Sequence, residues 1–91
     1  MGVQRRTIVF SGRVQGVGFR MTAVQLARGL ELAGEIRNVE DGEVELIVEG
    51  PAAAIETLLR RLREHFGGLI RNVQQVHGTP TGLERGLRIT Y

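Results

Sequence analysis

The 91-residue sequence contains neither cysteine nor lysine. Without cysteine there are no disulfides, thiol nucleophiles or cysteine-ligated zinc sites. Without lysine there is no Schiff base and no P-loop lysine. Serine and aspartate occur once each, as Ser11 and Asp41, and the two histidines, His65 and His77, do not share the spacing of a zinc motif. A catalytic triad and a zinc site are therefore poorly supported.

Charge is also nearly balanced. All 12 basic residues are arginine, and 10 acidic residues leave a net charge of only +2. Nucleic-acid binding by phosphate neutralisation calls for a larger excess or a basic stripe. No apolar run approaches the roughly 18 residues of a membrane span, and no signal peptide opens the sequence. We expect a cytoplasmic protein with one domain over residues 1–91 and neither nucleic-acid nor membrane partners.

Periodicity predicts the elements of that domain. Alternating apolar residues predict strands over residues 7–14, 35–39, 43–49, 70–77 and 86–91. Helical spacing predicts helices over residues 19–32 and 51–66, the second with a stripe of Ile55, Leu58, Leu59, Leu62 and Phe66. This order indicates an α+β fold, the ferredoxin-like α/β sandwich, with two helices on one face of a five-stranded, mostly antiparallel sheet.

The charged residues of the third strand and of the second helix are expected on solvated faces. In the strand over residues 43–49, Glu43, Glu45 and Glu49 alternate with apolar residues, which predicts one face in water. The arginines of the second helix, Arg60, Arg61 and Arg63, are interpreted in the same way. Asp41-Gly42 is expected to turn the chain between the second and third strands, because this dipeptide tolerates positive φ.

The most informative segment, residues 12–20, reads Gly-Arg-Val-Gln-Gly-Val-Gly-Phe-Arg and lies between a strand and a helix. Backbone N–H groups at a helix start are unpaired and lie at the positive end of its dipole. Gly16 and Gly18 allow successive N–H groups to turn inward, and the Arg20 guanidinium can hold two phosphate oxygens. These features predict a phosphate-sized anion pocket. Alternatively, the glycines only form a tight turn and Arg20 is solvated.

A second candidate is Asn38, on the strand that precedes the Asp41-Gly42 turn. Asparagine is depleted in strand interiors, so its presence asks for a reason. Its amide could position a water molecule, or it could instead satisfy nearby backbone groups at a strand end. The other asparagine, Asn72, follows a glycine turn, where asparagine is common.

Residues 12–20 match the first signature of the acylphosphatase family, and residues 34–45 resemble its second. This resemblance implies hydrolysis of the carboxyl–phosphate bond of small-molecule acylphosphates by direct water attack, without a metal or other cofactor. It places the phosphate-binding arginine on Arg20 and the water-orienting asparagine on Asn38, both catalytic, and implies the strand order 4-1-3-2-5. The implied phosphate-binding residues are Gln15, Gly16, Val17, Gly18, Phe19 and Arg20.

Three residues depart from the family's usual pattern. Glu31 stands in a Leu-Glu-Leu sequence where the family usually has Leu-Gly-Leu. If this residue ends the helix in the left-handed conformation, the glutamate costs about 1 kcal/mol relative to glycine. Glu35 replaces a common aromatic residue, and Leu87 a frequent phenylalanine. These changes bear on packing and stability, and they leave Arg20 and Asn38 unaffected.

Two rival functions are weighed against the enzyme. An RNA-recognition sandwich stacks bases on paired sheet aromatics, and the four aromatic residues here are not arranged that way. The other rival is a non-catalytic or specialised module that binds phosphate or carbamoyl phosphate, as in hydrogenase-maturation carbamoyltransferases. In those proteins proline typically follows the signature arginine, whereas here Met21 does. For the enzyme we expect inorganic phosphate to be product and inhibitor, and the chain to be monomeric.

Overall fold

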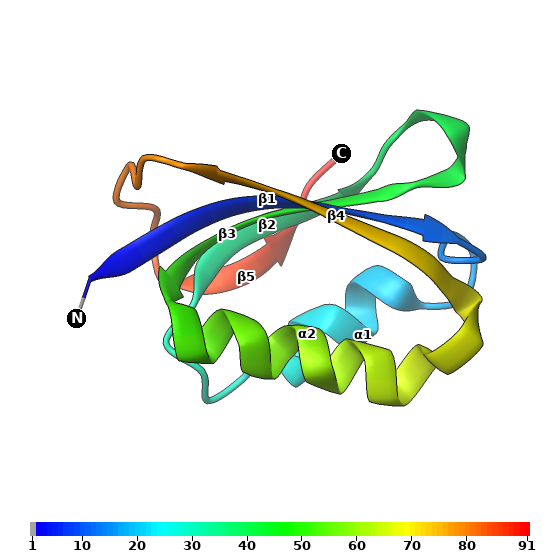
Figure 1. Ribbon diagram of the computed structural model, residues 1–91, viewed down its shortest axis with the longest axis horizontal. Helices are drawn as coiled ribbons and strands as arrows, with labels where there is room; N and C mark the ends of the chain where they lie inside the picture. The colour runs from blue at the N-terminus through cyan, green and yellow to red at the C-terminus, as the bar shows by residue number, and fades with distance from the viewer. Residues whose placement is uncertain (1) are drawn as a thin grey trace.

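The computed structural model describes residues 2–91. The chain forms a sheet with two helices on one of its faces (Figure 1). In chain order the elements are β1 (Val3–Gly12), α1 (Phe19–Leu26), β2 (Ala33–Asn38), η1 (Glu40–Gly42), β3 (Val44–Pro51), α2 (Ala52–Phe66), η2 (Gly67–Leu69), β4 (Ile70–Gly78) and β5 (Gly86–Ile89).

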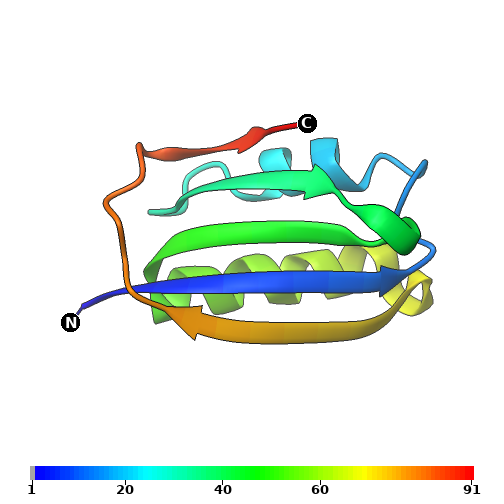
Figure 2. The same cartoon turned by 90° about the horizontal axis from the view of Figure 1, so that it is seen from above.

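The five strands lie side by side in the order β4-β1-β3-β2-β5 (Figure 2). β1 pairs antiparallel with both β3 and β4, β2 pairs antiparallel with β3, and β5 joins β2 in parallel. The expected ferredoxin-like α+β fold is therefore confirmed, and so is the strand order that the family resemblance implies.

The core lies between the sheet and the helices, because the apolar residues of each layer face the other. All five residues of the predicted α2 stripe are buried. The Phe19 ring at the start of α1 lies between two other rings, with centroids 5.0 Å from Phe10 and 4.6 Å from Phe66. This packing fixes the start of α1 against both the sheet and α2. In the part of the chain described, neither helix combines the length and the apolar character needed to cross a membrane.

The first helix is shorter than predicted, since α1 ends at Leu26 and not at Leu32. Gly29 takes the left-handed conformation with φ 82°, which turns the chain out of the helix. Ala27 and Leu30 still face the core, so the apolar spacing continues past the helix end. Within residues 2–91, Asp41 is the one non-glycine residue with positive φ. Glu31 is therefore not left-handed, and the cost considered for it does not apply.

The first strand is longer at its start than predicted, because β1 begins at Val3 and ends at Gly12. The arginines near the start of β1 interrupt the apolar alternation from which the strand was predicted. Arg6 is buried despite its charge, and its Nη1 lies 2.6 Å from Oε2 of Glu56 on α2. The other strand ends differ from prediction by a few residues. The Asp41-Gly42 turn is confirmed, with positive φ at both residues, 63° and 77°.

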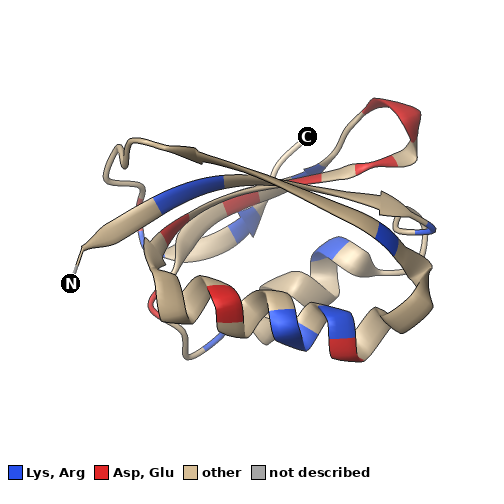
Figure 3. Cartoon of the chain, viewed as in Figure 1, with Lys and Arg blue, Asp and Glu red and all other residues tan. Residues whose placement is uncertain are grey.

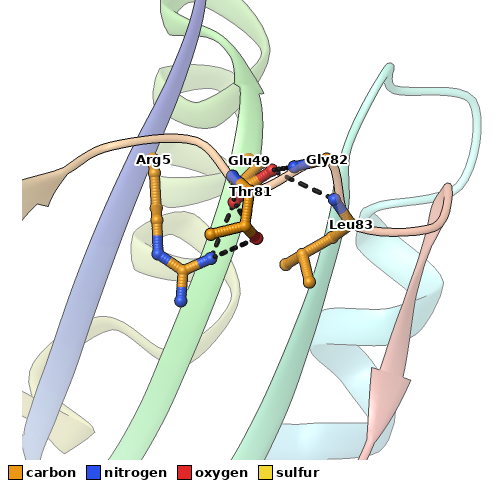
Figure 4. Close-up of polar contacts among 5 residues, drawn as sticks. All are labelled: Arg5, Glu49, Thr81, Gly82 and Leu83. Atoms are coloured by element: carbon orange, nitrogen blue, oxygen red, sulfur yellow. Dashed lines mark hydrogen bonds and ion pairs between the residues drawn. The ribbon is translucent and has the colours of Figure 1, made fainter.

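Glu49 is buried, which corrects the expectation that it faces water. The segment between β4 and β5 folds over it (Figure 4). The Glu49 carboxylate accepts hydrogen bonds from the Thr81, Gly82 and Leu83 amides, from the Thr81 hydroxyl, and from Arg5 Nη1 at 2.7 Å. Burial on its own would raise the pKa of Glu49, but these hydrogen bonds outweigh it and lower the pKa to about 2.

Candidate active site

The loop between β1 and α1 starts at a fixed point. Gly12 has φ 121°, and a side chain there would collide with the Leu69 carbonyl oxygen. The next residue, Arg13, donates its amide to that same oxygen at 2.8 Å. Val14 then points into the core and is 1% exposed. The loop therefore leaves the sheet at a place that η2 and the core determine together.

The amides of this loop have no hydrogen-bond partner in the described part of the chain. Gly16 and Gly18 have φ of 77° and 75°, and these left-handed residues alternate with Val17. Among residues 2–91, no acceptor takes a hydrogen bond from the amides of residues 15–19. The first hydrogen bond across the start of α1 runs from Thr22 N to Gly18 O, at 2.9 Å. A Cβ added to Gly16 or Gly18 would meet no atom within 4 Å, so the surface of the loop is open. Successive free amides beside a helix start form an anion-binding arrangement.

Arg20 lies in the first turn of α1 and is half-buried. Its guanidinium carbon lies 5.5 Å from the centre of the Tyr91 ring, a cation–π contact. No carboxylate within the described chain forms an ion pair with Arg20. Its N–H groups therefore stay available to an anion, and the ring contributes to holding the guanidinium in place.

Asn38 is the last residue of β2, and its side chain is exposed. Because strand residues alternate in direction, Asn38 points to the same side of the sheet as Ile36, which is fully buried beneath the helices. In residues 2–91 its side chain makes no hydrogen bond. The alternative that Asn38 satisfies nearby backbone groups is therefore not what the structure shows, and its amide is open to a water molecule.

Tyr91, which contacts Arg20, follows a residue that pairs with β2. The Thr90 amide donates to the Ile36 carbonyl at 2.9 Å, which continues the pairing of β2 with the chain beyond β5. That register brings the end of the chain beside the end of β2, where Asn38 lies. Arg20 and Asn38 thus belong to one end of the molecule, on the helix-covered side of the sheet.

A side-chain contact that the sequence did not reveal joins the loop to the β2–β3 hairpin. Gln15 Nε2 donates to the Val39 carbonyl at 2.9 Å and to the Glu43 carbonyl at 2.8 Å. The family resemblance implied Gln15 only as a phosphate-binding residue. Its acceptors are 24 and 28 residues away, so no local pattern could have indicated this contact.

The other polar candidates lie elsewhere. His65 is near the end of α2 and His77 near the end of β4, both exposed. Over residues 2–91, no three histidine, aspartate or glutamate side chains gather as a metal site would require. Arg61 donates to the Leu26 carbonyl and so holds α2 to α1. Basic and acidic residues are interspersed along the chain, and acidic residues occupy the tip of the β2–β3 hairpin (Figure 3).

Comparisons with known proteins identify the relatives of this chain. The sequence profile of the family called Acylphosphatase matches residues 6–86. An acylphosphatase of Acidiphilium cryptum is 55% identical over 56 residues, a match that spans 62% of each chain. An acylphosphatase of Roseiflexus is 37% identical over a 94-position alignment that covers 100% of this chain and 99% of the relative.

Solved structures give a consistent result. The crystal structure of an acylphosphatase from Bacillus subtilis superposes with a TM-score of 0.85 at 32% identity, covering 99% of this chain and 100% of that one. A full-length HypF in its phosphate- and nucleotide-bound form has a TM-score of 0.88 at 29% identity. The match covers 99% of this chain but only 12% of HypF.

Proposed function

This chain belongs to the acylphosphatase family, and we propose that it hydrolyses the carboxyl–phosphate anhydride of small acylphosphates. The observation that carries this proposal is the arrangement around the β1–α1 loop. Within residues 2–91, the loop amides have no protein acceptor, Arg20 has no ion pair and the Asn38 side chain has no hydrogen bond. All of them lie at one end of the molecule. Such a set can hold a phosphoryl group and a water molecule at the same time.

In the proposed reaction the amides of residues 15–19 and the Arg20 guanidinium bind the phosphoryl oxygens. Asn38 holds the attacking water. A bond forms between the water oxygen and phosphorus while the bond from phosphorus to the acyl oxygen breaks. The carboxylate leaves without needing a proton, and a phosphoryl oxygen of the substrate takes the proton of the attacking water. The chain therefore contributes positioning and electrostatic stabilisation, not a strong general acid.

The proposal also covers the cofactor requirement, the inhibitor, the oligomeric state and the location of the enzyme. The chemistry above uses only groups of the chain, so we propose that it needs no metal or other cofactor. Inorganic phosphate is the product, and because it carries the group that the loop binds, it should inhibit. We propose that residues 1–91 act as a single domain, as a monomer, in the cytoplasm.

A second candidate function rests on the likeness to HypF. The matched segment is a small part of that longer protein, whose structure holds phosphate. This chain would then be a specialised module that binds phosphate or carbamoyl phosphate without hydrolysing an acylphosphate. The residues that bind phosphate would be the same in both cases, so only turnover separates the two functions.

Benzoyl phosphate hydrolysis decides between them. We expect turnover by the purified chain in the presence of a metal chelator, and competitive inhibition by inorganic phosphate. Phosphate titration followed by NMR should shift the amide signals of Gly16 and Gly18 in either case. Phosphate binding without hydrolysis would favour the module, and unchanged Gly16 and Gly18 signals would contradict the proposed binding loop.

A further inference from the structure

We propose that the Gln15 side chain is a positioning residue that sets the phosphate-binding loop in register with Asn38. The inference rests on the proposed function, and it assigns to Gln15 a role that its backbone amide does not perform. The side chain would act through Asn38 and would not itself touch the substrate.

The contact uses the full donor capacity of the side-chain amide. One nitrogen, Nε2, donates to two carbonyl oxygens, those of Val39 and Glu43. These residues flank the hairpin turn, and the Val39 amide also donates to the Glu43 carbonyl at 2.9 Å. Gln15 therefore bonds to both residues that flank the turn, Val39 directly after β2 and Glu43 directly before β3.

This contact joins the phosphate-binding loop to the hairpin that carries Asn38. Gln15 precedes Gly16 in the loop, and Val39 directly follows Asn38 in the hairpin. The loop is also anchored by a backbone hydrogen bond from Arg13 to Leu69, but this bond leads to η2 on the β4 side of the sheet, away from Asn38. In the part of the molecule that the structure describes, no other hydrogen bond joins loop residues 13–18 to residues 38–44. The distance from the bound phosphorus to the water on Asn38 therefore depends on Gln15.

The expected consequences separate positioning from folding. Gln15 is exposed, so its loss should lower the melting temperature by less than about 5 °C. A reacting group misplaced by about 1 Å can lower a rate by about 100-fold. Phosphate binding depends on the loop amides and on Arg20, which Gln15→Ala leaves in the chain. We therefore expect kcat to fall and phosphate affinity to stay.

The experiment compares Gln15→Ala and Gln15→Glu with wild type in benzoyl phosphate hydrolysis. The glutamate has the same shape, but it presents a carboxylate to two carbonyl oxygens and cannot donate. Both variants should lower kcat by about 10- to 100-fold, while the inhibition constant of phosphate for Gln15→Ala stays within about 3-fold. The matched control is Gln25→Ala, an exposed glutamine on α1, which should keep wild-type kcat.

A double variant tests whether Gln15 acts through Asn38. In an Asn38→Ala background, Gln15→Ala should lower kcat by less than about a further 3-fold, because that background has already lost the side chain that holds the attacking water. If the two substitutions lower kcat independently, so that their fold-losses multiply in the double variant, the role of Gln15 is overturned. It is also overturned if the wild type is active and Gln15→Ala has the same kcat. Either result leaves the proposed function intact. A wild-type chain that binds phosphate but does not hydrolyse benzoyl phosphate would overturn the proposed function, and this role with it.

Discussion

The guanidinium carbon of Arg20 lies 5.5 Å from the centre of the Tyr91 ring, so the first turn of α1 meets the chain beyond β5. Tyr91 is 96% exposed, and this contact therefore buries little of the ring. Its effect is directional: the negative face of the ring attracts the guanidinium and narrows the positions that it samples. Removing the ring tests whether this restraint matters to anion binding.

We expect Tyr91→Ala to weaken phosphate inhibition by about 2- to 5-fold, which corresponds to the 0.5–1 kcal/mol of an exposed cation–π contact. Tyr91→Phe keeps the aromatic face and should behave like wild type. The inhibition constants of phosphate for the three proteins, measured at one ionic strength, provide the test. Equal constants for Tyr91→Ala and wild type would show that Arg20 is held without the ring.

Arg20 itself should matter much more. Each charge-assisted hydrogen bond to a phosphoryl oxygen is worth about 1.5–3 kcal/mol, and a guanidinium can make two. Arg20→Ala should therefore raise the inhibition constant of phosphate at least about 10-fold and lower kcat/KM by about 100-fold or more. Arg20→Lys should restore only part of this, because an ammonium lacks the planar fork. Arg28→Ala, at an exposed arginine after α1, is the control, and equal losses at both positions would indicate a general charge effect.

Asn38 should show the opposite division between binding and turnover. It holds the water and not the phosphoryl group in the proposed reaction, so Asn38→Ala should lower kcat by about 100- to 1,000-fold while the inhibition constant of phosphate stays within about 3-fold. Asn72→Ala, at an exposed asparagine on β4, is the matched control and should retain wild-type kcat. Wild-type turnover by Asn38→Ala would remove Asn38 from the mechanism.

The loop and the order of helices and strands could be predicted from local sequence patterns. Glycine tolerates the left-handed conformation that Gly16 and Gly18 adopt, and the α2 stripe follows from helical spacing alone. The contacts of Gln15 with Val39 and Glu43, and of Arg20 with Tyr91, join residues far apart in the chain. They depend on the strand register, which periodicity does not specify. Periodicity also overextended α1, because apolar residues at helical spacing continue through the turn at Gly29.

Strand alternation likewise predicted the direction of Glu49 but not its surroundings. Alternation places Glu49 on the sheet face opposite the helices, and solvent was the expected neighbour there. The segment between β4 and β5 covers this position and supplies three backbone amides to the carboxylate. The sequence of that segment, rich in threonine, glycine and proline, indicates a loop without indicating what the loop covers.

The Glu49 contacts predict a fold that loses stability in acid. Because these hydrogen bonds hold the pKa of Glu49 at about 2, below its ordinary value of 4.5, its contribution is present above pH 4.5 and is lost as the pH falls toward 2. A shift of this size corresponds to a contribution on the order of 3 kcal/mol at neutral pH. Glu49→Gln should therefore lower the free energy of unfolding at pH 7 and flatten its decrease between about pH 5 and pH 2, measured by urea unfolding. Glu40→Gln, at an exposed glutamate, should keep the wild-type slope. A wild-type slope in Glu49→Gln would assign the acid sensitivity to another carboxylate.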